Sequence, residues 1–165
     1  MRAKIVVADA GPLIALAVAD VLPVCISMLA GLAVPEAVLQ ECIADSYAPG
    51  AAVIEHLHRE NRFEVIPHTE IVPLDTALAQ GLGTGEIAVL SYATQHQLLA
   101  LIDERRARRV AQRLNISVIG SGSLLATLQR QGFIDSVEPA FAAWQKHGYF
   151  VSEKVKDDIR RSCGA

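Results

Sequence analysis

Two segments with residues typical of buried strands each have a carboxylate as their last residue. Asp9 follows the β-branched run AKIVVA, and Asp103 follows LLALI. A carboxylate at the end of a strand lies at the edge of a sheet, where it can bind a cation or cap the next helix. For Asp103 the sequence leaves both interpretations open, because a helix rich in arginine is predicted directly after it.

Two further carboxylates lie on or beside the apolar stripe of a predicted helix. Glu86 shares a helical face with Val89, Leu90 and Ala93, a spacing that normally marks buried positions. Glu41 borders the apolar stripe of an earlier helix. Both have a structural alternative. Glu86 can be an anion that the dipole of a first helical turn favours by about 0.3–1 kcal/mol, and Glu41 a solvated surface residue.

Four carboxylates at one edge of a sheet would repel one another unless a cation neutralised them. Mg²⁺ and Mn²⁺ take carboxylate and water oxygens and leave positions free for a phosphate. The five histidines have no spacing typical of a metal site, so we interpret them as surface or structural residues. The sequence therefore predicts Mg²⁺ or Mn²⁺ as the cofactor.

Basic residues follow Asp103 closely. Residues 103–113 contain five arginines and carry a local charge of +3. Arg105, Arg109 and Arg113 share one helical face at spacings of four, and such a face can follow a phosphate backbone beside a metal. A solvated helix face with intrahelical ion pairs is the alternative.

Two glycine-rich segments could bind phosphate. GSGS at residues 120–123 follows a predicted strand and opens a helix, so its N–H groups, with Ser121 and Ser123, can bind an anion; a simple turn and helix cap explains the same pattern. GLGTGE at residues 81–86 lacks the spacing of a dinucleotide or P-loop motif, which argues against a nucleotide site.

The elements that must position these residues alternate between strands and helices. Strands are predicted at 3–9, 62–67, 98–103 and 116–120. Helices are predicted at 13–19, 22–32, 35–47, 49–61, 85–97 with Thr84 as cap, 104–114, 121–132 with Gly132 as C-cap, and two in the C-terminal region of about 135–161, hinged at Gly148.

This alternation predicts an α/β fold with a mostly parallel sheet covered by helices. Ligands in such folds bind beyond the carboxyl ends of the strands. Asp9 and Asp103 both occupy that end of their predicted strands, which indicates a functional site there.

Length and composition limit the possibilities. A chain of 165 residues fits one domain that buries a core without disulfides. Its hydrophobic fraction of 52% against 20% charged residues excludes a disordered chain and favours self-association or an apolar partner. The net charge of −3 gives no global attraction to nucleic acid, so such binding depends on local basic patches. Three widely spaced cysteines favour a reducing, cytoplasmic location.

The N-terminus imitates a signal peptide, because basic residues precede an apolar stretch. Asp9 and the Gly11-Pro12 pair interrupt that stretch, which argues against a signal helix. The uncharged run between Asp20 and Glu36 is shorter than the roughly 20 residues of a membrane span. We therefore expect no membrane segment.

The residues described above resemble those of a PIN domain, a small α/β metal-dependent nuclease fold found in VapC-type toxins. The resemblance extends to a branch known as nucleic acid-binding proteins that contain a PIN domain. It covers most of residues 3–130 and rests on IVVADAGPLIAL, VPEAVLQEC, GLGTGEIAVLSYA and LLALIDERRARRVAQRLNISVIGSGSLL. By these motifs the acidic quartet of the family corresponds to Asp9, Glu41, Glu86 and Asp103.

The resemblance implies a three-layer α/β/α fold in a single domain over residues 1–165, with a core at about 3–130. It also implies an endoribonuclease whose Mg²⁺ or Mn²⁺ is held by the quartet, and, from the toxins, a toxin of a toxin-antitoxin pair with a small antitoxin-like partner.

Two departures favour a different function. Ala10 and Gly11 follow the first acid where PIN nucleases usually have Ser or Thr, and Glu86 replaces a usual Asp. These favour the alternative of a catalytically weak or inactive PIN-like protein that binds nucleic acid or regulates through a partner. A receiver-like phosphoacceptor is a third hypothesis, but Asp9 has no acidic neighbour and the segment ISVIGSGS has no lysine.

Overall fold

The computed structural model describes residues 4–164. Residue 3 of the strand expected at 3–9, and residues 1–3 and 165 of the expected domain, lie outside the described residues. A five-stranded parallel sheet has the order β3-β2-β1-β4-β5. The strands are β1 Ile5–Ala8, β2 Gly31–Pro35, β3 Glu64–Ile66, β4 Leu99–Leu101 and β5 Val118–Ile119.

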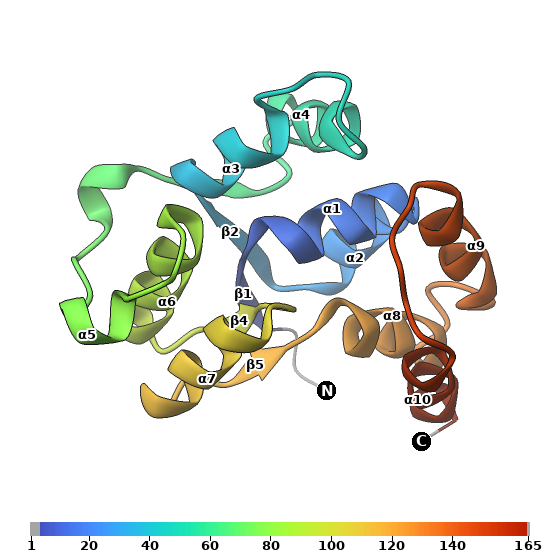
Figure 1. Ribbon diagram of the computed structural model, residues 1–165. Helices are drawn as coiled ribbons and strands as arrows, with labels where there is room; N and C mark the ends of the chain where they lie inside the picture. The colour runs from blue at the N-terminus through green and yellow to red at the C-terminus, as the bar shows by residue number, and fades with distance from the viewer. Residues whose placement is uncertain (1–3, 165) are drawn as a thin grey trace.

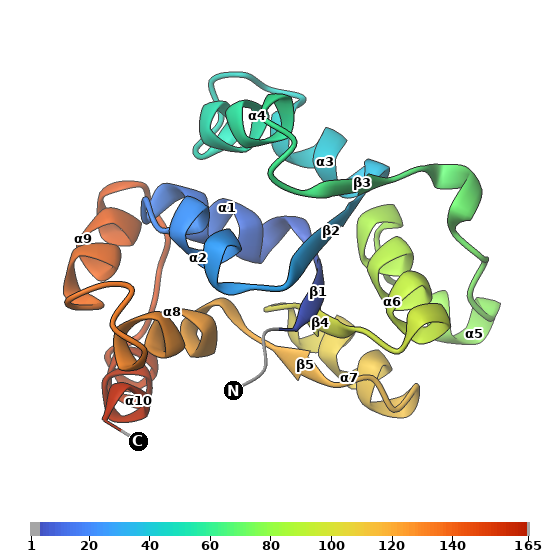
Figure 2. The same cartoon turned by 180° about the vertical axis from the view of Figure 1, so that it is seen from behind.

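Helices cover both faces of the sheet, as Figures 1 and 2 show from opposite sides. One face carries α1, α2 and α8, and the other carries α6 and α7. This confirms the expected three-layer α/β/α fold. The helices are α1 Ala10–Val18, α2 Leu22–Met28, α3 Glu36–Ile43, α4 Ala51–Arg59, the 3₁₀ turn η1 His68–Glu70, α5 Thr76–Ala79, α6 Thr84–His96, α7 Arg105–Arg113, α8 Ser121–Arg130, α9 Glu138–Lys146 and α10 Glu153–Cys163.

The centre of the sheet is built from residues that suit a strand buried on both faces. Val6, Val7 and Ala8 of β1 are at most 1% exposed, as expected for a central parallel strand between two layers of helices. The pairing of β1 with β4 continues to the strand end, where the Asp9 N–H donates to the Leu101 carbonyl at 3.0 Å. The carboxyl ends of β1 and β4 therefore lie side by side.

One prediction is wrong in this region. The expected helix over residues 22–32 ends at Met28, and Gly31–Pro35 forms β2, paired in parallel with β1. Both structures can bury such a short apolar run, and periodicity alone does not distinguish them. The sheet therefore has one strand more than predicted, and this strand, β2, lies between β1 and β3.

The C-terminal helices pack against the rest of the molecule. Gly148 has the left-handed φ of +79° between α9 and α10, which favours glycine and confirms the expected hinge. On α8, a Cβ at Gly122 would lie 2.8 Å from Ile159 Cδ1 of α10. Glycine at this position thus permits the close approach of the two helices.

Trp144 joins α9 to the core, and its replacement by Phe is expected to lower the free energy of unfolding by about 1–2 kcal/mol. The side chain is 3% exposed, and its Nε1–H donates to the Ala15 carbonyl at 2.8 Å. Phe would lose this buried hydrogen bond and leave a small void. Urea unfolding measures the change, and a loss below about 0.5 kcal/mol would contradict it.

No single helix in residues 4–164 has the length and apolar character to span a membrane. The pair α1 and α2 would pass on length and composition together, but the two helices are bent by 116° at their break.

Candidate active site

Asp9 is the buried centre of the acidic site. It follows β1, occupies the N-cap position of α1 without a side-chain capping bond, and is 7% exposed. Burial raises the pKa of Asp9 to about 6; the backbone N–H of Ala10 opposes this rise, while the carboxylates of Glu86, Glu41 and Asp103 add to it. The structure thus brings the negative charge of the other three predicted acids to bear on Asp9.

Glu41 reaches this centre from α3. If Gly85 on α6 carried a Cβ, that atom would lie 3.2 Å from Glu41 Oε2 and 3.8 Å from Asp9 Oδ1. Both carboxylates therefore approach the first turn of α6 at the same place. The absence of a side chain at Gly85 leaves room for them, which gives this glycine a role that the sequence motif alone did not indicate.

Glu86 is half-buried in the first turn of α6. Its Oε2 accepts a hydrogen bond from the Gly83 N–H at 2.8 Å, so Glu86 bonds back to the N-cap. The N-cap is Gly83, not Thr84 as predicted, because Thr84 already has helical geometry. One oxygen of Glu86 is therefore held by the backbone.

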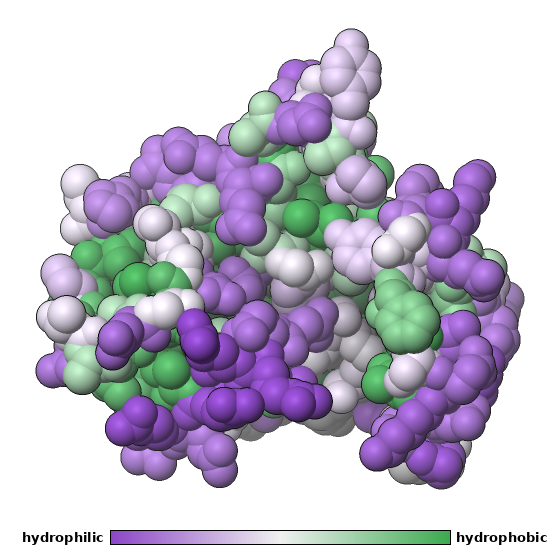
Figure 3. Space-filling model, in the orientation of Figure 1, coloured by the Kyte–Doolittle hydropathy of each residue, from purple (hydrophilic) through white to green (hydrophobic). Residues whose placement is uncertain are grey.

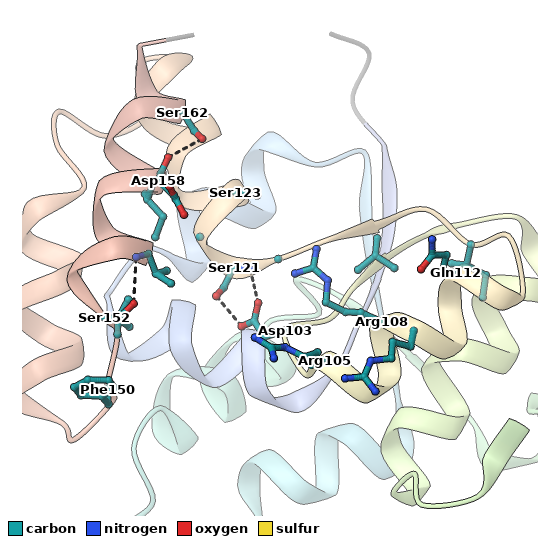
Figure 4. A pocket seen from close by; sticks show the side chains of 18 residues that line it. Asp103, Arg105, Arg108, Gln112, Ser121, Ser123, Phe150, Ser152, Asp158 and Ser162 are labelled. Carbon is teal, nitrogen blue, oxygen red and sulfur yellow. Dashed lines mark hydrogen bonds between the residues drawn. The ribbon is translucent and has the colours of Figure 1, made fainter.

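Asp103 does not cap α7. That role belongs to Glu104, whose Oε2 accepts from the Ala107 N–H at 2.8 Å, a bond that lowers the pKa of Glu104. Asp103 instead accepts from both donors of Ser121, the N–H at 2.8 Å and the hydroxyl at 2.7 Å (Figure 4). Asp103 thus connects the end of β4 to the first residue of α8, and Ser121 holds both of its oxygens.

Arginine side chains border the acidic site. Arg105 and Arg109 line a groove of about 1040 Å³ that includes Asp103 and both Ser121 and Ser123. Arg108 also lines this groove, whereas Arg113 is not among its lining residues.

Arg108 was not predicted, although its spacing of three from Arg105 places it on a neighbouring part of the helical surface. A Cβ at Gly120 would lie 3.3 Å from Arg108 Nη1 and 3.1 Å from Asp103 Oδ1. The side chains of Arg108 and Asp103 therefore both lie next to Gly120, although no ion pair joins them among residues 4–164.

A family model described as a PIN domain matches residues 5–165. The chain belongs to the PIN domain family. Among curated proteins, none matches it. Membership confirms the resemblance to a PIN domain and gives this chain a nuclease fold, in a family that binds nucleic acid and generally depends on divalent metals.

The donor set of this PIN domain fits a hydrated Mg²⁺ or Mn²⁺. The four acids offer only hard carboxylate oxygens, and none of the ion pairs in residues 4–164 involves them. Within the same residues, no three Asp, Glu, His or Cys side chains are arranged to hold a metal ion together. Mg²⁺ needs only one or two carboxylates because it keeps several waters, so the arrangement suits an ion bound partly through water.

The contacts of Asp103 predict how its variants fold. Asp103→Asn is expected to change the free energy of unfolding by less than about 0.5 kcal/mol, because Asn can accept from the Ser121 N–H and donate to its hydroxyl. Asp103→Ala loses both bonds and is expected to cost about 1 kcal/mol. Urea unfolding of the two variants checks this, and equal stabilities would contradict it.

Proposed function

We propose that this PIN domain is an endoribonuclease that depends on Mg²⁺ or Mn²⁺ and hydrolyses RNA phosphodiester bonds at Asp9, Glu41, Glu86 and Asp103. The observation that carries the proposal is the buried carboxylate of Asp9. Burial raises its pKa, and the negative charges of three other carboxylates raise it further. Such a cluster is costly to ionise without a cation. The choice of RNA over DNA rests on analogy with PIN-domain toxins.

Each acid would have its own part in this reaction. Asp9 and Asp103, at the ends of adjacent strands, would hold the cation, with Glu86 beside them. Glu41 is exposed, so its Oε2 can accept a proton from the attacking water. A divalent cation at such a site lowers the pKa of water and stabilises negative charge on the phosphate. Arg105 and Arg109, which line the groove beside Asp103, would hold the substrate phosphates.

The narrower form of this proposal is a cytoplasmic toxin with a small antitoxin-like partner. Ala10 and Gly11 offer no hydroxyl beside Asp9, and backbone or Ser121 donors hold oxygens of Glu86 and Asp103. These observations favour the second candidate function, which is binding of nucleic acid without efficient cleavage. A small reading frame next to the gene, whose product binds this protein and blocks its activity, would support the toxin.

A cleavage assay on structured RNA tests the proposal. The wild-type protein is expected to cut RNA in Mn²⁺ or Mg²⁺ and not in EDTA, and Asp9→Asn combined with Asp103→Asn is expected to abolish the activity. Cleavage that survives in the double variant would come from another site or a contaminant and would overturn the proposal. Binding of RNA without cleavage in any divalent metal would support the second candidate.

A further inference from the structure

The groove beside Asp103 has two walls of different chemistry. Figure 3 shows hydrophilic side chains gathered over α7 and a hollow between them and the surface over α10. In Figure 4, Arg105 and Arg108 lie on one side of Asp103 and Ser121, and Phe150 and Ser152 lie on the other. Asp103, a proposed catalytic acid, therefore lies between a basic wall and a wall that contains Phe150 and Val155.

The α7 wall fits phosphate. Arg105, Arg108 and Arg109 all line the groove and are exposed. None of them takes part in the ion pairs found in residues 4–164. Three exposed guanidinium groups that take part in none of these ion pairs attract an anionic chain.

The opposite wall fits a nucleobase. Phe150 is 93% exposed although it is a large aromatic side chain, and Val155 on α10 is 45% exposed in the same groove. Val151 and Ser152, which connect Phe150 to α10, also line it. A largely exposed aromatic face in a groove lined by arginines is an arrangement by which proteins stack unpaired bases.

The charges of the two walls indicate which side of the groove the phosphates of a bound strand would face. Asp158 of α10 lines the wall that contains Val155, and its carboxylate is paired with Arg161. The residues of this wall that line the groove include no lysine or arginine, so the backbone of a bound strand belongs on the α7 side and its bases on the side of Phe150. The close packing of Ile159 on Gly122 sets the distance between α8 and this wall.

We propose that the groove between α7 and α10 binds single-stranded RNA, with phosphates on Arg105, Arg108 and Arg109 and an unpaired base stacked on Phe150. The proposal rests on the proposed function for its choice of RNA and names the subsite beside the acids that would select unpaired segments. Paired bases are stacked within their own helix, so a duplex offers no free face to Phe150.

Binding in EDTA tests the subsite without catalysis. The probe is a 12-nucleotide oligouridylate labelled with fluorescein, compared with the same chain lacking its bases, and fluorescence anisotropy gives the Kd. Phe150→Ala is expected to raise the Kd for oligouridylate about 10-fold, as the loss of one stacked base does, and to leave the Kd for the base-free chain unchanged. Phe150→Trp is expected to retain full affinity.

Matched variants separate the two walls. Tyr47→Ala removes an aromatic side chain that is 96% exposed and outside the groove, and it is expected to change neither Kd. Arg108→Ala is expected to weaken binding of both chains and to reduce the slope of log Kd against log salt by about 0.7, the contribution of one phosphate on a single strand. Arg113→Ala, on the same helix but outside the lining of the groove, is expected to change this slope less.

Three outcomes would overturn the subsite. One is an equal Kd of wild type and Phe150→Ala for oligouridylate, which leaves the nuclease proposal standing. Another is an equal loss of affinity for both probes, which excludes stacking. The third is a change of oligomeric state by light scattering in Phe150→Ala with RNA binding intact, which would make this wall a protein interface. Binding that depends on Phe150 in a protein that cleaves no RNA would support the subsite and contradict only the nuclease.

Discussion

Asp9→Asn is expected to stabilise the metal-free protein by about 2–3 kcal/mol at pH 8. Burial, with the nearby carboxylates, raises the pKa of Asp9 from 3.8 to about 6. Above pH 6 the Asp9 carboxylate is charged in both states, but it is buried in the folded protein and hydrated in the unfolded chain. A shift of about two pKa units corresponds to a cost of about 3 kcal/mol for carrying this charge in the folded state. Asn has a similar shape and removes that charge.

The sign of this effect depends on pH. The pKa is higher in the folded state, so the stabilising contribution of protonated Asp9 is present below about pH 4 and is lost as the pH rises through 6. The stability difference between Asp9→Asn and wild type should therefore be small near pH 4 and reach its maximum above pH 6. Urea unfolding in EDTA across this range measures it. If Asp9→Asn were less stable than wild type at pH 8, the claim that the buried charge of Asp9 destabilises the folded protein would be contradicted.

The same variant separates stability from metal binding. In wild type, Mn²⁺ is expected to raise Tm, because an ion that binds only the native state stabilises it. In Asp9→Asn this rise should disappear although the metal-free variant is the more stable protein. Asp75→Asn is a matched control at a surface helix cap of α5 and should keep the wild-type response.

Glu41→Gln is expected to lower the rate of RNA cleavage by about 100-fold or more without lowering stability. The side chain is exposed, but its Oε2 reaches the place between Asp9 and α6 where the acids meet. Gln keeps the size of Glu, but its amide does not accept a proton from water and attracts a divalent cation less strongly than a carboxylate does. Single-turnover cleavage in Mn²⁺ at equal folded fraction measures the effect.

Glu36→Gln is the control for this variant. Glu36 lies on the same helix, and its carboxylate accepts from the backbone N–H of His68 at 3.1 Å, a bond that Gln can also make. Its cleavage rate should match that of wild type. Equal losses in both variants would point to a general effect of charge on RNA binding and would remove Glu41 from the reaction.

The sequence predicts the strands at the centre of the sheet and the positions of Asp9 and Asp103 at their ends, because these signals are local. The β-branched run before Asp9 is typical of a buried strand, and Asp9 with the Gly11-Pro12 pair marks its end; Gly11 and Pro12 themselves lie in the first turn of α1. The segment before Pro35 is equally apolar but includes no comparable boundary, so β2 was not predicted. Its identity depends on pairing with β1, which is a tertiary contact.

The partners of the acids could not be predicted for the same reason. Ser121 holds Asp103 from 18 positions further along the chain, and no local pattern indicates that pairing. Glu86 lies in the first turn of α6, where its carboxylate accepts from the Gly83 N–H, and its charge also acts on Asp9, so both interpretations of this residue stay open. Phe150 has no sequence signal at all, because its exposure depends on how α10 packs on α8.

Anomalous scattering from crystals soaked in Mn²⁺ tests most directly whether the acidic edge is a metal centre. If it is, a peak is expected at roughly 2.0–2.2 Å from an oxygen of Asp9 or Asp103, with further ligands from water, and no peak is expected there in Asp9→Asn. Saturating Mn²⁺ that leaves these carboxylates without a peak, or a peak that remains in Asp9→Asn, would contradict a metal centre at these acids.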